Sequence, residues 1–189
     1  MPAPRATVWT PEAVRALPDD GKRYELIDGE LIVTPAPVPR HQRMARELFV
    51  VINPYVVRHG LGELLWSPAD ISLDPDSIVQ PDLFVVPARE AGLIREWSDV
   101  RALLLAIEIL SPSTARFDRG VKRDYFQRRR VPEYWVIDLD ARLIERWRPD
   151  GQQPDVARDR LIWQPSSTVA PLDLDVRALF AAAVGDAQG

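Results

Sequence analysis

Residues 103–138, LLLAIEILSPSTARFDRGVKRDYFQRRRVPEYWVID, decide the fold of this chain. The stretch opens with an apolar run, Leu103–Leu110, and its end belongs to a second apolar run, Glu133–Leu139. Short apolar runs of this length are typical of buried strands, and the basic segment between them is typical of a helix. The stretch therefore predicts a strand–helix–strand unit.

The first of these strands carries a single acid, Glu108, among apolar neighbours. A charged carboxylate in a buried strand costs free energy unless an opposite charge compensates it. A metal ion would compensate it, and so would Lys122 on the helix that follows. A buried acid and a lysine in this order predict the start of a metal-dependent active site.

Outward from this unit, the expected elements alternate in type. A hairpin is expected over Arg23–Val33, and a long helix begins at His41 with an apolar stripe that includes Val51. Pro54 is expected to kink this helix or end it early, and Ile78–Val86 reads as a further strand. This mixed order predicts an α/β or α+β fold, a mixed β-sheet flanked by helices.

Length and composition indicate an ordinary globular protein. At 189 residues, the chain is expected to form a single domain, residues 1–189. Cysteine is absent, which excludes disulfides, thiolate metal sites and thiol nucleophiles. No apolar run reaches the roughly 20 residues of a membrane span, and the N-terminus lacks the apolar core of a secretory signal. We therefore expect a cytoplasmic protein.

Several enzyme classes lack their motifs in this sequence. There is no Gly-x-Ser-x-Gly motif, which argues against a serine hydrolase, and no glycine-rich loop that could hold a phosphate. Two histidines without any cysteine make a zinc site a poor explanation.

The charge of the chain is unevenly distributed. The net charge is −4, yet residues 116–130 contain seven basic side chains against two acids. A basic patch of this kind can bind nucleic acid, and it can also be the solvated face of a helix. Both interpretations stay open.

A second acid, Asp82, lies in the strand expected over Ile78–Val86. If that strand neighbours Leu103–Leu110 in one sheet, Asp82 and Glu108 offer carboxylate oxygens to a hard divalent ion such as Mg²⁺ or Mn²⁺. Such an ion generates hydroxide near neutral pH and stabilises charge on a phosphodiester, and a lysine beside it can orient the water. The alternative is that each acid is a structural residue satisfied by its neighbours.

In combination, these residues resemble the PD-(D/E)XK nuclease superfamily, and in particular its Uma-type family of restriction endonucleases. The resemblance spans residues 24–138, and the residues that carry it are Tyr24–Leu31, His41, Pro81, Asp82, Glu108–Thr114, Asp118, Lys122, Tyr125 and Val131–Asp138. It implies a restriction-endonuclease-like fold and a magnesium-dependent endonuclease that hydrolyses the phosphodiester bonds of DNA. It further implies that Asp82 and Glu108 are the metal ligands and Lys122 the catalytic lysine.

Two further residues are candidates for the catalytic site. Glu25 is a candidate accessory acid near the metal, whereas Glu30 has the opposite strand parity and should face away from it if the hairpin is regular. His41, at the start of its helix, is a candidate contact for a phosphate or a metal-bound water. Its alternative role is a local hydrogen bond at the helix terminus.

One position departs from the superfamily signature. The signature has lysine two residues after the strand acid, because those two positions share one face of a strand. Here that position is Leu110, so Lys122 would have to reach the site from the following helix. The alternative is a surface pair between Asp118 and Lys122 at helical i, i+4 spacing.

Two other interpretations stay open. A catalytically silent nuclease-like domain could bind nucleic acid or a protein partner, and divalent-ion binding would separate it from the enzyme. A homodimer is also expected, because nucleases that cut duplex DNA commonly act as symmetric pairs. Trp135 and Trp147, at strand positions, are the predicted interface residues if they are exposed.

Overall fold

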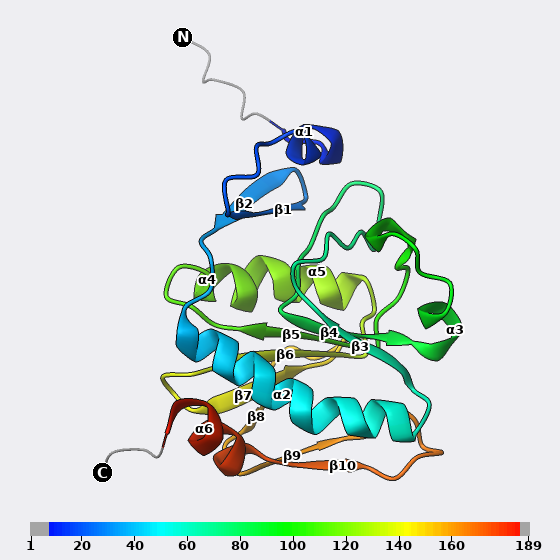
Figure 1. Ribbon diagram of the computed structural model, residues 1–189, viewed down its shortest axis with the longest axis vertical. Coiled ribbons are helices and arrows are strands. Elements are labelled where there is room, and N and C mark those ends of the chain that lie inside the picture. The colour runs from blue at the N-terminus through cyan, green and yellow to red at the C-terminus, as the bar shows by residue number, and fades with distance from the viewer. Residues whose placement is uncertain (1–7, 186–189) are drawn as a thin grey trace.

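Two parallel strands, β5 (Leu105–Ile109) and β6 (Glu133–Asp138), lie at the centre of a six-stranded sheet in the computed structural model, which describes residues 8–185 (Figure 1). The strand order is β3-β4-β5-β6-β7-β8, and every other neighbouring pair is antiparallel. The remaining strands of this sheet are β3 (Gly62–Trp66), β4 (Leu83–Pro87), β7 (Leu143–Trp147) and β8 (Asp155–Ala157). The predicted mixed sheet is confirmed.

Helices cover both faces of the sheet (Figure 1). On one face lie α2 (Pro39–Arg58) and α6 (Val176–Val184), together with the hairpin of β9 (Arg160–Trp163) and β10 (Leu172–Asp175). The other face carries the helical connection between the two parallel strands. It comprises α4 (Ala115–Phe117), the π-helical turn η2 (Asp118–Lys122) and α5 (Arg123–Arg128). This is the crossover that parallel strands require, and it confirms the strand–helix–strand unit.

The sheet has a hydrophobic core on each face: the first lies against α2 and α6, and the second lies against α5. The strands of the central sheet contribute alternate residues to these two cores. In β5, Leu105, Ile107 and Ile109 pack toward α2 and α6, whereas Ala106 packs toward α5. In β4, Val85 faces the first core and the residues beside it face the second. Because side chains alternate along a strand, position 108 faces the α5 side.

Helix α2 is longer than the sequence indicated. It begins at Pro39 and continues through Pro54 to Arg58. Pro54 is exposed, and the carbonyl left without its usual partner belongs to Val50, which is also exposed, so water can satisfy it. The buried stripe contains Ile52, and the assignment of Val51 to the core was wrong, because that side chain is 36% exposed.

The N-terminal part forms a small layer beside the α5 face. Helix α1 (Pro11–Arg15) precedes the predicted hairpin, which is confirmed as β1 (Arg23–Ile27) and β2 (Glu30–Thr34). Leu26 exchanges two backbone hydrogen bonds with Ile78, which ties the hairpin to the segment before β4. That segment makes only isolated bridges, so the strand expected from Ile78 begins at Leu83 instead.

The last short elements follow β4, where α3 (Ala88–Ala91) and the 3₁₀ turn η1 (Trp97–Asp99) interrupt an irregular segment. Among residues 8–185, no helix has the length and apolar character needed to cross a membrane. The prediction that Trp135 and Trp147 are exposed interface residues was wrong. Their side chains are 0% and 7% exposed, because both lie inside the sheet's two cores.

Candidate active site

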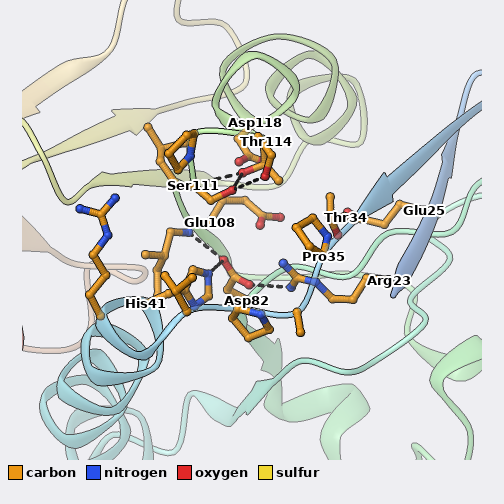
Figure 2. Close-up of a pocket in the computed structure, with 18 of the residues that line it drawn as sticks. Arg23, Glu25, Thr34, Pro35, His41, Asp82, Glu108, Ser111, Thr114 and Asp118 are labelled. Carbon is orange, nitrogen blue, oxygen red and sulfur yellow. Dashed lines mark hydrogen bonds and ion pairs between the residues drawn. The ribbon is translucent and has the colours of Figure 1, made fainter. Parts of the chain in front are cut away.

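The two predicted strand carboxylates lie on neighbouring strands. Asp82 directly precedes β4, Glu108 lies in β5, and the antiparallel ladder pairs Leu83 with Ile107. One further step of that register places Asp82 opposite Glu108. Both side chains point into the same pocket on the α5 side, and both are almost fully buried (Figure 2).

Lys122 reaches this pocket from the helical connection. Its Nζ lies 2.5 Å from Glu108 Oε1 and 2.8 Å from Glu25 Oε1. Asp118 is farther away, at 3.9 Å, and all four side chains are buried. The alternative of an exposed Asp118–Lys122 surface pair was therefore wrong.

The local backbone explains how a helical lysine replaces the one missing from the strand. Asp118 and Lys122 begin and end the π-helical turn η2, and both of their side chains point inward. Turns of this kind insert one residue into a helix and recur at functional sites. Leu110, at the position of the signature lysine, is buried and packs with the core on the α5 side.

Asp82 belongs to a second cluster of contacts. Its Oδ1 accepts a hydrogen bond from the Arg23 guanidinium at 2.8 Å. Its Oδ2 accepts one from the amide of Ile109 at 2.8 Å and lies 2.9 Å from His41 Nε2 (Figure 2). His41 thus contacts a candidate catalytic carboxylate through the start of α2, and its role is not the local helix-terminus bond considered from the sequence.

The two clusters shift the pKa values of their carboxyl groups in opposite directions. Burial alone would raise the pKa of Asp82, but the hydrogen bond and charge of His41, with Arg23, lower it to about 2. Burial raises the pKa of Glu108 well above its usual value, although Lys122 opposes the shift. Burial likewise raises the pKa of Asp118 to about 6. Opposed shifts in one pocket are typical of functional sites.

The ammonium group of Lys122 responds to its three acidic neighbours. Burial alone would lower the pKa of Lys122, but the charges of Glu108, Glu25 and Asp118 outweigh burial and raise it. The side chain therefore stays protonated near neutral pH. It can donate hydrogen bonds and supply positive charge, but it cannot act as a general base.

The pocket itself has a volume of about 580 Å³ and opens between the β1–β2 hairpin, the start of α2 and the loop after β5 (Figure 2). Arg23 and Thr34 line it, and neither was singled out in the sequence. They are cross-strand partners in the hairpin, and the Thr34 hydroxyl is buried without a hydrogen-bond partner in the described part of the chain. Strand parity could have identified Arg23 as a pocket residue, because Arg23 and Glu25 are two residues apart and share one face of the strand.

The donor chemistry of the pocket suits a hard divalent ion. Four buried carboxylates face two permanent cations, Lys122 and Arg23; the carboxylates belong to Glu25, Asp82, Glu108 and Asp118. The carboxyl groups outnumber the cations by two, and a divalent ion would favour the ionised forms of Glu108 and Asp118 against the effect of burial. Oxygen ligands are those that Mg²⁺ prefers. Within residues 8–185, however, no three His, Asp or Glu side chains already stand in metal-binding geometry. Ion pairs hold the carboxylates instead.

Comparison with known sequences identifies the family of the chain. The profile of the Uma2 family, described as "Putative restriction endonuclease", matches residues 11–177. The chain belongs to the Uma2 family. No curated protein matches this sequence.

A solved structure extends the likeness of this Uma2 chain to the fold. It is the crystal structure of "a putative nuclease belonging to DUF820" from Anabaena variabilis ATCC 29413, which superposes with a TM-score of 0.75 at 21% sequence identity. The match covers 93% of this chain and 99% of that one. The restriction-endonuclease-like fold expected from the sequence is confirmed for this Uma2 member.

The basic segment of the Uma2 chain has a different environment from the one its composition indicated. Lys122 is buried in the pocket, and five of the other six basic residues have carboxylate partners within 4 Å: Arg119, Arg123, Arg128, Arg129 and Arg130. Among the described residues, Arg116 is the one basic side chain of this segment without such a partner. Most of the local charge excess is therefore balanced by acids from other elements.

Proposed function

We propose that this protein is a metal-dependent endonuclease that hydrolyses the phosphodiester bonds of DNA. The observation that carries the proposal is the buried lysine between two carboxylates, with Lys122 Nζ 2.5 Å from Glu108 and 2.8 Å from Glu25. Asp82 lies in the same pocket, on the neighbouring strand. Membership of a family described as restriction endonucleases supports the same class of reaction.

In this proposal, Asp82 and Glu108 hold the divalent ion, Mg²⁺ or Mn²⁺, with Glu25 as an accessory acid. The bound ion supplies a water of lowered pKa and stabilises charge on the phosphodiester. Lys122, kept protonated by its neighbours, donates to the attacking water and offsets negative charge in the transition state. His41 keeps Asp82 ionised and oriented through the 2.9 Å contact.

Loading the site requires an exchange of partners. Both oxygens of Asp82 are engaged, by Arg23 on one side and by His41 and the Ile109 amide on the other. Glu108 is held by Lys122. A divalent ion therefore competes with Arg23 for Asp82 and shares Glu108 with Lys122. Competition of this kind predicts modest affinity in the absence of substrate.

The test is a calorimetric titration of Mn²⁺ into the wild type and into Glu108→Ala, followed by cleavage assays on circular and linear DNA. We expect binding that disappears in Glu108→Ala, together with metal-dependent cleavage that is lost in Glu108→Ala and in Asp82→Asn. Asp82→Asn is preferred to alanine because it retains an acceptor for Arg23 and Ile109.

A matched control is Glu30→Ala in the same hairpin as Glu25. The register places Glu30 opposite Ile27 and so on the same face as Glu25, which corrects the parity expected from the sequence. Glu30 is nevertheless exposed at the turn and does not line the pocket, so both binding and cleavage should survive. Absence of Mn²⁺ binding to folded wild type, with DNA present, would instead favour the catalytically silent nuclease-like domain. Unchanged cleavage in both Glu108→Ala and Asp82→Asn would overturn the residue assignment.

A further inference from the structure

Trp66 is a large aromatic side chain left exposed beside the pocket. It is the last residue of β3, and 57% of its surface is accessible. Strand β3 lies at the edge of the sheet (Figure 1). The aromatic contact of Trp66 is with Phe49 of α2, in an edge-to-face arrangement at 5.1 Å between ring centroids. An exposed tryptophan of this kind retains apolar ring surface that folding has not buried.

The backbone of Trp66 lies close to that of Asp82, although their side chains lie on opposite faces of the sheet, with Trp66 on the α2 face beside Phe49. Trp66 pairs with Leu83 in the β3–β4 ladder, and the amide of Ser67 donates to the Asp82 carbonyl at 3.1 Å. Neighbouring strands lie about 4.8 Å apart. Trp66 is thus one strand away from the backbone of a candidate metal ligand, at the same level of the sheet.

The surface between them is hollowed. A cavity of about 330 Å³ adjoins the active-site pocket and shares Arg23, His41 and Asp82 with it. At its other end it shares Trp66 with a further hollow of about 230 Å³, which Phe49 also lines. These cavities form one groove that runs from the carboxylates to the tryptophan, and we refer to it as the Trp66 groove.

Three basic side chains line the Trp66 groove, and each is paired with a carboxylate: Lys22 with Asp20, Arg23 with Asp82 and Arg46 with Glu47. Lys22 and Arg23 line its inner part, and Arg46 of α2 lines its outer part. Asp19 is the acidic side chain of the rim, besides Asp82 itself. Lys22 and Arg46 are exposed, so phosphate can exchange with their carboxylate partners. Exposed cations beside an aromatic ring are typical of single-stranded nucleic-acid sites, where the backbone meets cations and bases stack on rings.

We propose that the Trp66 groove binds an unstacked base of a single DNA strand, next to the phosphodiester held at Asp82 and Glu108, with Trp66 as the stacking surface. The proposal rests on the proposed function, because it names the substrate class of that same site. A cavity of about 330 Å³ lies in the size range of small-molecule sites, so it has room for a base. A base paired inside a duplex cannot reach it without leaving its stack. The preferred substrate is therefore single-stranded.

The competing occupant of this surface is a second copy of the chain. Strand β3 is an edge strand, and an edge strand can pair with another chain. In that arrangement Trp66 would be buried in an interface and would be unavailable for stacking. The Trp66 groove shares Arg23, His41 and Asp82 with the active-site pocket, and this continuity favours the substrate strand over a copy of the same chain.

The test compares the binding of fluorescein-labelled oligothymidylate and of a duplex of the same length, in Ca²⁺ to slow cleavage, by fluorescence anisotropy. We expect Trp66→Ala to weaken oligothymidylate binding by about tenfold or more, and Trp66→Phe to retain most of the affinity because a ring remains. The matched control is Trp97→Ala. Trp97 is also partly exposed (37%), contacts Phe84 and lies outside the groove, so its variant should bind like the wild type.

Other results would overturn the proposal. One is equal affinity of wild type and Trp66→Ala for the single strand. A duplex bound more tightly than the single strand, with the same dependence on Trp66, is another. A dimer seen by sedimentation that Trp66→Ala dissociates, without any change in oligothymidylate binding, would assign the surface to a second copy.

The failure of this proposal can be distinguished from failure of the proposed function. Binding of oligothymidylate that depends on Trp66, without any Mn²⁺-dependent cleavage, would support the groove and contradict catalysis. Cleavage that depends on Glu108 but is unchanged in Trp66→Ala on single-stranded DNA would support catalysis and overturn the groove.

Discussion

Lys122 and Glu108 form an ion pair with 2.5 Å between Nζ and Oε1, and this pair joins the π-helical turn η2 to the centre of β5. Glu25 contacts the same ammonium group at 2.8 Å, so the hairpin, the sheet and the helical connection meet at one buried charge. The active-site pocket is therefore part of the structural core, and its substitutions should change stability as well as activity.

Replacing Lys122 should destabilise the fold. Lys122→Met leaves Glu108 and Glu25 buried without a cation, and losing one partner of a buried ion pair costs about 3–5 kcal/mol. Glu108→Gln should differ by less than about 1 kcal/mol from the wild type, because Lys122 retains Glu25 and the surplus of carboxylates becomes smaller. Urea unfolding at pH 7 measures both. Equal decreases in the free energy of unfolding of Lys122→Met and Glu108→Gln would contradict this account of the buried charges.

Asp118 should make the stability of the metal-free protein fall with rising pH. Burial raises the pKa of Asp118 to about 6, so between pH 4 and 6 the folded state binds more protons than the unfolded state. Stability from this group is therefore present below about pH 4 and is lost as pH rises toward 6. The total effect is about 2–3 kcal/mol.

Asp118→Asn tests this directly, since it removes the titrating group and keeps the size of the side chain. The decline between pH 4 and 6 should become shallower in the variant, in urea-unfolding series measured at several pH values; the part that remains comes from Glu108, whose pKa burial also raises. Asp82 provides the opposite case, because its pKa is lowered to about 2 and its contribution is lost only as the pH falls below about 4. A decline of the same size in wild type and Asp118→Asn would assign it to another group.

The central part of the sheet could be predicted from the sequence because the apolar patterns that define it are local. The strand of Glu108, the crossover and the strand of Trp135 are adjacent in the chain, and each has a clear apolar pattern. Two predictions for residues outside this strand–helix–strand unit were wrong, because their outcome depends on tertiary packing. Pro54 does not end α2, because the Val50 carbonyl that loses its hydrogen bond is exposed to water. Trp147 is buried in the core on the α5 side, and the local pattern predicted that helix but not its packing against Trp147.

The sequence identified the acids and the lysine of the pocket but not its arginine. Asp82, Glu108 and Lys122 were identified, and the structure brings them into one pocket with Glu25 and His41. The ion pair of Arg23 with Asp82 joins residues far apart in the chain, so spacing along the sequence could not show it. The ion pairs of the basic segment could not be predicted for the same reason, because most of its acidic partners, such as Asp28 for Arg128, come from other elements.

Gly62 should be intolerant of any side chain. Its φ is +144°, and a Cβ built there would lie 1.8 Å from the carbonyl oxygen of Val86 on the neighbouring strand. Gly62→Ala should therefore cost about 3 kcal/mol or more, because β3 must move away from β4. Gly60→Ala is the control, since its φ is also positive (+57°) but no atom lies within 4 Å, so about 1 kcal/mol is expected. Thermal unfolding compares the two, and similar losses would contradict the close approach at Gly62.

Arg23 should weaken divalent-ion binding in the free protein, because it occupies Asp82 Oδ1 at 2.8 Å and places a positive charge beside the proposed ligand. Arg23→Met should then bind Mn²⁺ more tightly than the wild type, by about tenfold, which corresponds to about 1.4 kcal/mol. Asp82 remains ionised at pH 7 in this variant, because its hydrogen bonds with His41 and the Ile109 amide persist. The control is Lys22→Met, which removes the neighbouring charge from an exposed pair with Asp20 and should leave Mn²⁺ affinity unchanged. Calorimetry at constant ionic strength measures both variants. Weaker Mn²⁺ binding in Arg23→Met would mean that Arg23 supports the site in its loaded form, and it would remove the competition on which the modest affinity of the free protein was argued.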